Sequence, residues 1–417
     1  MVAYQHFIAL SNSSNTEHRG EAAHMVATAF IEHDGPQDER AALYASMLGF
    51  LDDSSAKVRG SLALALLRSE LAPRLIMLSL AKDAAIIARA VVQYSPVLLD
   101  VDLIGIAKVA EPGVLLALSC RENLSEKLID RLALSGDERV IKSLLSRQEL
   151  EIAKEALGKL VQTHGHVASI RGKLLARKEL SASCRLQLVE NIKQDLCQNK
   201  MVKGAIAAGR LERITRDALD SSASRIGEEQ SMAGNDEFAL YMQDNKRINT
   251  RLLIHCVING QVLFFADCIA LIGEIPPKKV FALLKGGARA SLNVLFHQCG
   301  MSEPMRNLMA RLIMYARDAD LSCDDGARHF VVSAIIEELI IEHEGDIPHS
   351  LQDAFRYLDE QNMVFAKAAA RGVMPAFAQN IDQNQELAFR QGLSQVSGQV
   401  AEDEHSFAPE RLALPAA

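Results

Sequence analysis

An arginine followed three residues later by a leucine recurs in the first half of the chain at near-equal intervals. The four copies begin at Arg68, Arg121, Arg147 and Arg177, and a fifth segment, residues 95–98, keeps the leucine without the arginine. A row of regularly spaced guanidinium groups has the chemistry to bind an anionic polymer. At helix ends, the same arginines would instead hydrogen-bond open carbonyls and complement the helix dipole. Capping is sufficient to explain them, and the polymer-binding alternative stays open.

Positive charge gathers in the middle of the chain, although the whole chain carries a net charge of −8. Residues 139–216 hold 16 lysines and arginines against 7 aspartates and glutamates. An exposed basic helix face is usually only solvated, but a concave basic groove would bind an acidic protein or nucleic acid. Stacking on single-stranded nucleic acid is disfavoured, because only one aromatic residue lies between positions 50 and 238. The residues best suited to contact a partner are Arg171, Lys173, Arg177, Lys178 and Arg185.

A set of histidines and cysteines in the second half of the chain raises the question of a metal site. No two of them show the CxxC or HxxxH spacing of paired zinc ligands. Buried thiols and ordinary histidines explain the set, so we predict no metal. Its members are His255, Cys256, Cys268, His297, Cys299, Cys323 and His329.

No catalytic constellation is recognisable elsewhere. The pair Gly286 and Gly287 precedes an expected helix but lacks the GxxxxGK[ST] frame of a phosphate loop, so a turn between helices is favoured. The carboxylates at residues 337, 338 and 342 indicate a solvated acidic helix face. There is no GxSxG or HExxH motif. We therefore predict no catalytic residues, no cofactor and no enzymatic activity.

The elements that position the arginines are short helix pairs. The leucines of the five segments are spaced by 27, 26, 26 and 30 residues, and a fixed period in this range is typical of stacked helical repeats. A second landmark keeps the same period: an apolar residue opens each first helix, at Val58, Ile87, Val114, Val140 and Val167. Helices of this length are marginal alone in water, so stacking must hold them.

The domain organisation follows from where this period begins and ends. We predict a helix within residues 1–36, a helical-repeat domain (α-solenoid) of about 27-residue repeats over 37–200, and a connecting helix with a hinge over 201–235. The hinge or loop is indicated by Ser221-Ser222-Ala223-Ser224, Gly227 and Ala233-Gly234-Asn235. Longer helices separated by glycine and proline breakers predict a compact helical domain over 236–375. We expect these helices over 247–259, 262–272, 278–284, 288–298, 304–317 and 327–344, with one or two more over 351–372. A tail rich in Gln, Asn, Ser and Glu over 376–417 is expected to be disordered.

Composition agrees with an all-α fold. Hydrophobic residues make up 49% of the chain, aromatics only 5%, and tryptophan is absent, which favours helices packed on helices. The most apolar stretch, about a dozen residues over 262–273, contains Asp267 and is too short to span a bilayer. Seven scattered cysteines and the absence of a secretory signal indicate the cytoplasm.

The copies resemble leucine-rich-repeat-variant and HEAT-type helical repeats, most closely at residues 95–107 and next at 121–133. Over about residues 40–375 the chain also resembles a bacterial domain-of-unknown-function family, in which a helical array precedes a second helical block. That resemblance implies an all-helical cytoplasmic protein without an assigned activity. The second block is carried by Leu252-Leu253, Asn259-Gly260-Gln261, Phe264-Phe265, Ala270-Leu271, Ile275-Pro276, Val280, Leu292 and Cys299-Gly300-Met301.

The period and the missing catalytic set together favour a non-catalytic scaffold or adaptor that binds a protein partner through its repeats. The alternative is nucleic-acid binding along the basic repeats, and a third possibility is a ligand sensor or enzyme that uses the C-terminal helical domain. Within the array, residues 140–216 are the first place to look for a partner, because the excess positive charge gathers there.

Overall fold

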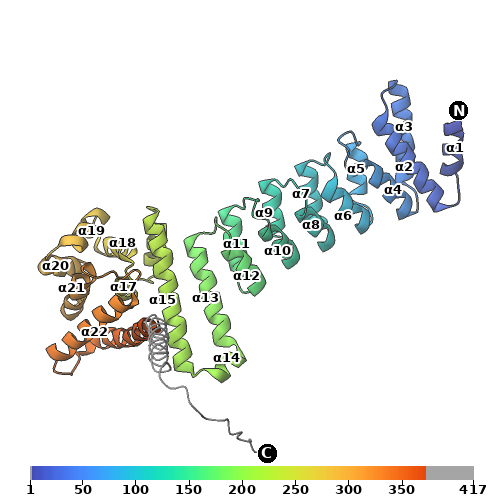
Figure 1. The fold of residues 1–417 in the computed structure, drawn as a ribbon. Helices are drawn as coiled ribbons and strands as arrows, with labels where there is room; N and C mark the ends of the chain where they lie inside the picture. The colour runs from blue at the N-terminus through green and yellow to red at the C-terminus, as the bar shows by residue number, and fades with distance from the viewer. Residues whose placement is uncertain (1, 372–417) are drawn as a thin grey trace, which may run out of the picture. The chain divides into compact units, whose positions relative to one another are not determined.

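The described part of the chain is built from helices packed on helices (Figure 1). The computed structural model describes residues 2–371, with side chains described from residue 5. No strand occurs among these residues, so the predicted all-α class is confirmed. By its internal contacts the chain divides into two compact units, Met1–Ser222 and Ala223–Ala417. The predicted tail over 376–417 lies outside the described residues.

Five helix pairs of the first unit follow the predicted period. The first helix of each pair packs on the first helix of the next, and from the second pair onward the second helices do the same. The pairs are α4 (Ala56–Leu66) with α5 (Arg74–Leu80), α6 (Ala85–Tyr94) with α7 (Asp100–Val109), α8 (Pro112–Ser119) with α9 (Glu126–Ala133), α10 (Glu138–Ser146) with α11 (Lys154–His164), and α12 (Ala168–Leu175) with α13 (Ala182–Gln198).

Local sequence sets where these helices begin. The side chains of Ser55, Ser125, Asp137 and Ser181 each accept a hydrogen bond from a backbone N–H in the first turn of the helix that follows. Such caps satisfy donors that have no partner within the helix.

Four of the five predicted apolar anchors lie in the hydrophobic core, near the start of the first helix of their copy. Val58, Ile87, Val114 and Val140 are buried. Val167 instead precedes α12 as its N-cap, and Ile170 takes the core position.

The array begins earlier in the chain than the predicted boundary at residue 37. Residues 1–36 hold two helices, α1 (Val2–Ser11) and α2 (Thr16–Glu32), and α2 packs extensively on α4. The α2 side chain Arg19 reaches Asp53 with a 2.7 Å ion pair, and Arg59 of α4 reaches Asp83 at 2.6 Å. Because the same contact joins α2 to the first copy and α4 to the second, α2 acts as a preceding repeat helix. It is followed by α3 (Gln37–Leu51).

The first part of the predicted hinge, residues 221–224, is helical. After α14 (Lys200–Ala205), α15 runs unbroken over Ala208–Met232 and includes the serines at 221, 222 and 224. The Ser222 hydroxyl donates to the Ala218 carbonyl one turn earlier, so it is satisfied without breaking the helix. The predicted loop at residues 233–235 is present, with Gly234 at φ +72°.

The second unit is a bundle of helices close to the predicted ones, plus α16, which the pattern did not predict. Its aromatic core pairs Phe238 with Phe264 and Phe265 with Phe296, with ring centroids 5.8 and 6.4 Å apart. The helices are α16 (Glu237–Asp244), α17 (Thr250–Ile258), α18 (Val262–Gly273), α19 (Pro277–Gly286), α20 (Arg289–Gln298), α21 (Glu303–Arg317), α22 (Asp325–Glu342) and a helix over 349–371.

No helix in residues 2–371 combines the length and the apolar character that crossing a bilayer requires.

Candidate functional site: the groove along α7

The recurring arginines join one copy of the array to the copy before it. Arg121 donates to the carbonyls of Val92 and Ser95 at the end of α6, at 3.0 and 2.7 Å. Arg147 donates to the carbonyls of Ser119 and Arg121 at the end of α8, at 3.0 and 2.6 Å. The arginines therefore bond open helix carbonyls as predicted, but they cap the first helix of the neighbouring copy.

Two arginines nearer α13 also bond backbone carbonyls, Arg177 in the preceding copy and Arg185 in its own. Arg177 has no exposed surface and donates to the carbonyls of Arg147 and Leu150 beyond the end of α10. Arg185 donates to the carbonyls of Leu175 and Arg177 at the end of α12, at 3.0 and 2.6 Å. Arg68, the first of the series, lies over the Tyr94 ring instead, 5.0 Å from its centroid.

These contacts give three of the five predicted partner-binding residues a role inside the array. Arg171 is 9% exposed and donates to Gly165, His166 and Asp195. Arg177 is fully buried, and a side chain without exposed surface cannot meet a partner while the stack is intact. Arg185 is half-buried and bonded to two carbonyls. These three guanidinium groups are therefore engaged within the array, and the contact of residues 140–216 with a partner stays a prediction.

The two predicted lysines remain nearer the surface. Lys173 is half-buried and its Nζ donates to the Ser146 hydroxyl in the preceding copy. Lys178 is exposed. The structure therefore gathers Arg171, Lys173, Arg177 and Arg185 as links within and between copies, and leaves Lys178 alone in solvent.

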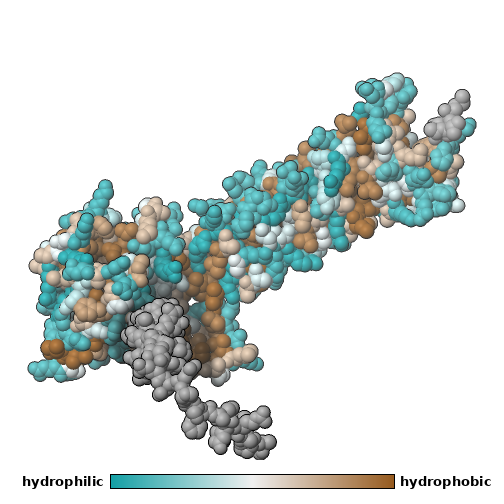
Figure 2. Space-filling view, in the orientation of Figure 1, coloured by the Kyte–Doolittle hydropathy of each residue, from teal (hydrophilic) through white to brown (hydrophobic). Residues whose placement is uncertain are grey.

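Large apolar side chains, which the charge pattern did not direct attention to, lie exposed at the other end of the array. Residues 64–109 expose eight of them, whereas residues 110–198, up to the end of α13, expose only Leu134 and Leu196. Scattered exposed apolar residues are normal, but a concentration marks an interaction surface. Figure 2 shows apolar side chains interrupting the hydrophilic surface around α4 and α5. The eight are Leu64, Leu71, Leu75, Ile86, Tyr94, Leu99, Val101 and Val109.

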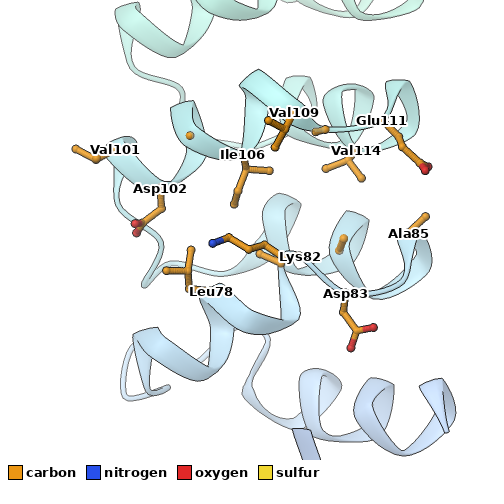
Figure 3. A pocket seen from close by; sticks show the side chains of 14 residues that line it. Leu78, Lys82, Asp83, Ala85, Val101, Asp102, Ile106, Val109, Glu111 and Val114 are labelled. Atoms are coloured by element: carbon orange, nitrogen blue, oxygen red, sulfur yellow. The ribbon is translucent and has the colours of Figure 1, made fainter. Parts of the chain in front are cut away.

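A groove of about 560 Å³ runs along α7 within this surface. Ile106, Val109 and Val114 project into it from α7 and α8, and Lys82 reaches across it from the turn after α5 (Figure 3). Val101 and Val109, at the rim, are 80% and 86% exposed. This α7 groove is lined by Leu78, Ala81, Lys82, Asp83, Ala85, Ala88, Val101, Asp102, Gly105, Ile106, Val109, Ala110, Glu111 and Val114.

The two aspartates of the α7 groove are already neutralised by arginines. Arg59 binds Asp83 through two hydrogen bonds, and Arg74 binds Asp102 in the same way. The arginine hydrogen bond is the main reason that the pKa of each aspartate lies below its ordinary value. Lys82 and Glu111 are the remaining charged side chains in the lining, and both are exposed. The groove is thus apolar between two opposite charges.

Acid should weaken the link between Arg59 and Asp83. A carboxyl whose pKa is lowered by folding stabilises the protein above its unfolded pKa of about 4, and that stabilisation is lost as pH falls through the folded value. We expect the difference in unfolding free energy between wild type and Asp83→Asn to stay constant from about pH 8 to 5 and to shrink below about pH 4. Urea titrations at each pH measure it. An undiminished difference at low pH would contradict this assignment.

The histidines and cysteines of the second unit do not form a metal site in the described residues. No group of three or more His, Cys, Asp and Glu side chains there is arranged to hold an ion. Burial, with Arg251 and Arg328 nearby, lowers the pKa of His255 to about 4, so its ring is neutral at pH 7. Burial raises the pKa of Cys268, and raises that of Cys299 to about 11. Neither thiol is a thiolate nucleophile at neutral pH.

Two further expectations for the second unit have clear outcomes. Gly286 and Gly287 do form a turn between helices, since α19 ends at Gly286 and α20 begins at Arg289. The acidic face of α22 is not merely solvated: Glu338 and Glu342 pair with Arg311 of α21, and Glu338 also accepts from the Tyr315 hydroxyl.

Comparison with known protein families shows which family this chain belongs to. The model of a family described as an uncharacterised protein conserved in bacteria, DUF2336, matches residues 87–341. The chain belongs to the DUF2336 family. The DUF2336 match runs from α6 to α22, so it includes most of the α7 groove, later array helices and the helical bundle. A search of curated proteins found no match.

Proposed function

We propose that this chain is a non-catalytic helical-repeat adaptor that binds a protein partner through the α7 groove. The observation that carries the proposal is the concentration of exposed apolar side chains over residues 64–109, with Val101 and Val109 at the groove rim. Protein interfaces bury apolar side chains, and the α7 groove offers such side chains beside the exposed charges of Lys82 and Glu111. The partner surface is therefore expected near the start of the array.

The alternative of nucleic-acid binding has less support. Phosphate contacts need exposed lysines and arginines, because their affinity comes from displacing counterions. Arg171 and Arg177 are buried and bonded to carbonyls of the array, so they contribute little to such a surface. We do not propose this function. We expect the adaptor to act in the cytoplasm, where a reducing environment suits its seven free cysteines.

Charge placed in the groove tests the proposal. Full-length wild type and a double variant, Val101→Asp with Val109→Asp, would be used to capture partners from cells that naturally make the protein. We expect the double variant to lose at least about tenfold in capture of partners that wild type retains specifically, since an unpaired carboxylate would be desolvated in the interface. Leu134→Asp is the matched control, because Leu134 is 50% exposed and lies outside the groove. Equal capture by all three proteins would refute the proposal.

Gly105 provides a test of stability within α7. It sits inside α7 in the groove lining, and a Cβ built there meets no atom within 4 Å. Since glycine inside a helix is about 1 kcal/mol less favourable than alanine, we expect Gly105→Ala to raise the unfolding free energy by about 0.5–1 kcal/mol. Chemical denaturation measures this change.

A bulkier residue at the same position should close the groove. We expect Gly105→Phe to fold and yet to reduce partner capture by at least about tenfold, because the ring would occupy the open space. Gly172→Phe is the matched control: Gly172 also faces open space within a helix but lies in α12. A Gly105→Phe protein that captures partners as well as Gly172→Phe would count against the groove.

A further inference from the structure

A second hollow lies in the helical bundle, between α17, α18, α19 and α21. Its volume is about 600 Å³, within the usual range for small-ligand sites, and spaces between bundle helices are a common place for them. Phe281 and Val262, in its lining, are 40% and 37% exposed. The lining residues are Val257, Val262, Leu263, Phe265, Phe281, Leu284, Lys285, Ile313, Ala316 and Arg317.

The lining of this hollow is apolar and carries only positive charge. Eight of its ten residues are apolar, the other two are the cations Lys285 and Arg317, and none is acidic. This contrasts with the chain as a whole, which carries a net charge of −8. An apolar wall with positive charge and no carboxylate complements a molecule that has an apolar body and one anionic end.

The guanidinium of Arg317 is held in a fixed position. Its Nε donates to the Leu284 carbonyl at 2.6 Å and its Nη2 to the Leu283 carbonyl at 2.9 Å, near the end of α19. These bonds use two of its three nitrogens. Lys285 follows directly in the same helix and is exposed. The two cations thus come from α19 and from the end of α21, and both line the hollow.

A neighbouring hollow, between α21 and α22, has carboxylates in its lining as well as arginines. It also contains Arg317, but its Arg311 is already paired with Glu338 and Glu342 of α22. Carboxylates in that lining would repel an anion. The apolar hollow is therefore the better site for an anionic amphiphile.

We propose that the hollow between α17, α18, α19 and α21 binds a free long-chain monocarboxylate, a ligand of the fatty-acid class. Its chain lies against Val262, Leu263 and Phe281, and its carboxylate contacts Lys285 and Arg317. Charge-assisted hydrogen bonds to the carboxylate orient the ligand, while burial of its chain supplies most of the affinity. This site is independent of the α7 groove.

Calorimetric titration of the full-length chain with sodium decanoate, kept below its micelle concentration, tests the proposal. We expect one decanoate to bind per chain, and Lys285→Glu and Ala316→Phe each to weaken binding by at least about tenfold, through repulsion and through filling of the hollow respectively. Lys279→Glu is the matched control, because Lys279 is an exposed lysine of α19 outside the lining. Thermal melts establish that each variant is folded.

Two additional titrations separate this ligand from related ones. Decanol shares the chain without the charge and should bind at least about tenfold more weakly than decanoate. Phosphatidylglycerol vesicles should not retain the protein in sedimentation. The proposal is overturned if wild type does not bind decanoate, if all variants bind it equally, if decanol binds as well, or if only the vesicles bind.

Discussion

Replacing Arg177 by methionine is expected to lower the free energy of unfolding of the array by about 3 kcal/mol, because the substitution leaves buried acceptors without a donor. Arg177 is fully buried and donates to the carbonyls of Arg147 and Leu150 in the preceding copy. Methionine keeps the apolar stem of the side chain but cannot donate. The substitution would weaken the packing of α12 on α10, the two helices that Arg177 links.

Urea unfolding of the full-length protein, followed by circular dichroism, measures this effect. Lys178→Met is the matched control, since Lys178 is adjacent and exposed, and such surface changes usually stay within about 0.5 kcal/mol. If Arg177→Met were as stable as Lys178→Met, the arginine would not be holding the copies together. The buried guanidinium would then have to be assigned another role.

Gly227→Ala is expected to destabilise the helical bundle by about 3 kcal/mol, although alanine normally favours a helix interior. A Cβ on Gly227 would lie 2.3 Å from Cδ2 of Phe264 and 2.4 Å from its Cγ. The Phe264 ring cannot easily move aside, because it is fully buried and packs at a tilt against the Phe238 ring, with centroids 5.8 Å apart. The adjacent Glu228 also accepts hydrogen bonds from the Leu263 and Phe264 amides, which fixes α15 against the start of α18.

Hydrogen exchange of the α16–α18 amides, together with the melting temperature, reports this loss. Gly209→Ala is the control, because it lies in the same helix and its Cβ would meet no atom within 4 Å. We expect Gly209→Ala to be neutral or stabilising. Unchanged protection of α18 in Gly227→Ala would show that the packing between α15 and Phe264 is not tight.

Much of the fold follows from periodicity. The anchors Val58, Ile87, Val114 and Val140 are all buried, because a residue that recurs once per repeat meets the same neighbours in every copy. Breakers such as Gly260 and Gly300, both at positive φ, correctly end helices of the second unit. The repeat period and the glycine breakers thus predict where helices begin and end better than they predict which side chains meet across the fold.

The contacts of polar side chains were harder to predict. Arg121 and Arg147 bond carbonyls about one period earlier in the chain, and sequence spacing alone does not distinguish those carbonyls from the ones in their own helix. The serines at 221–224 suggested a hinge, yet Ser222 bonds within α15. In both cases the side chain bonds a backbone carbonyl, and the sequence does not say which carbonyl lies within reach.

The location of the candidate partner surface was missed for a related reason. Val101 and Val109 are chemically like the buried Leu103 and Ile106 of the same helix, and only stacking determines which of them face solvent. Two signals were present in the sequence: a glycine at position 105 inside α7, and the missing arginine at Ser95 in the same copy. Of the two, only the missing arginine is an irregularity in the repeated pattern, because glycines also lie inside α4, α8, α11 and α12.

Site-specific crosslinking tests most directly whether the partner binds at the start of the array and not at its basic end. A photo-crosslinking amino acid would be placed at position 101, 134 or 178 of the full-length protein in its native cells. We expect a discrete crosslinked partner from position 101, in the α7 groove, and none from 134 or 178. A partner crosslinked from position 178 and not from 101 would contradict it.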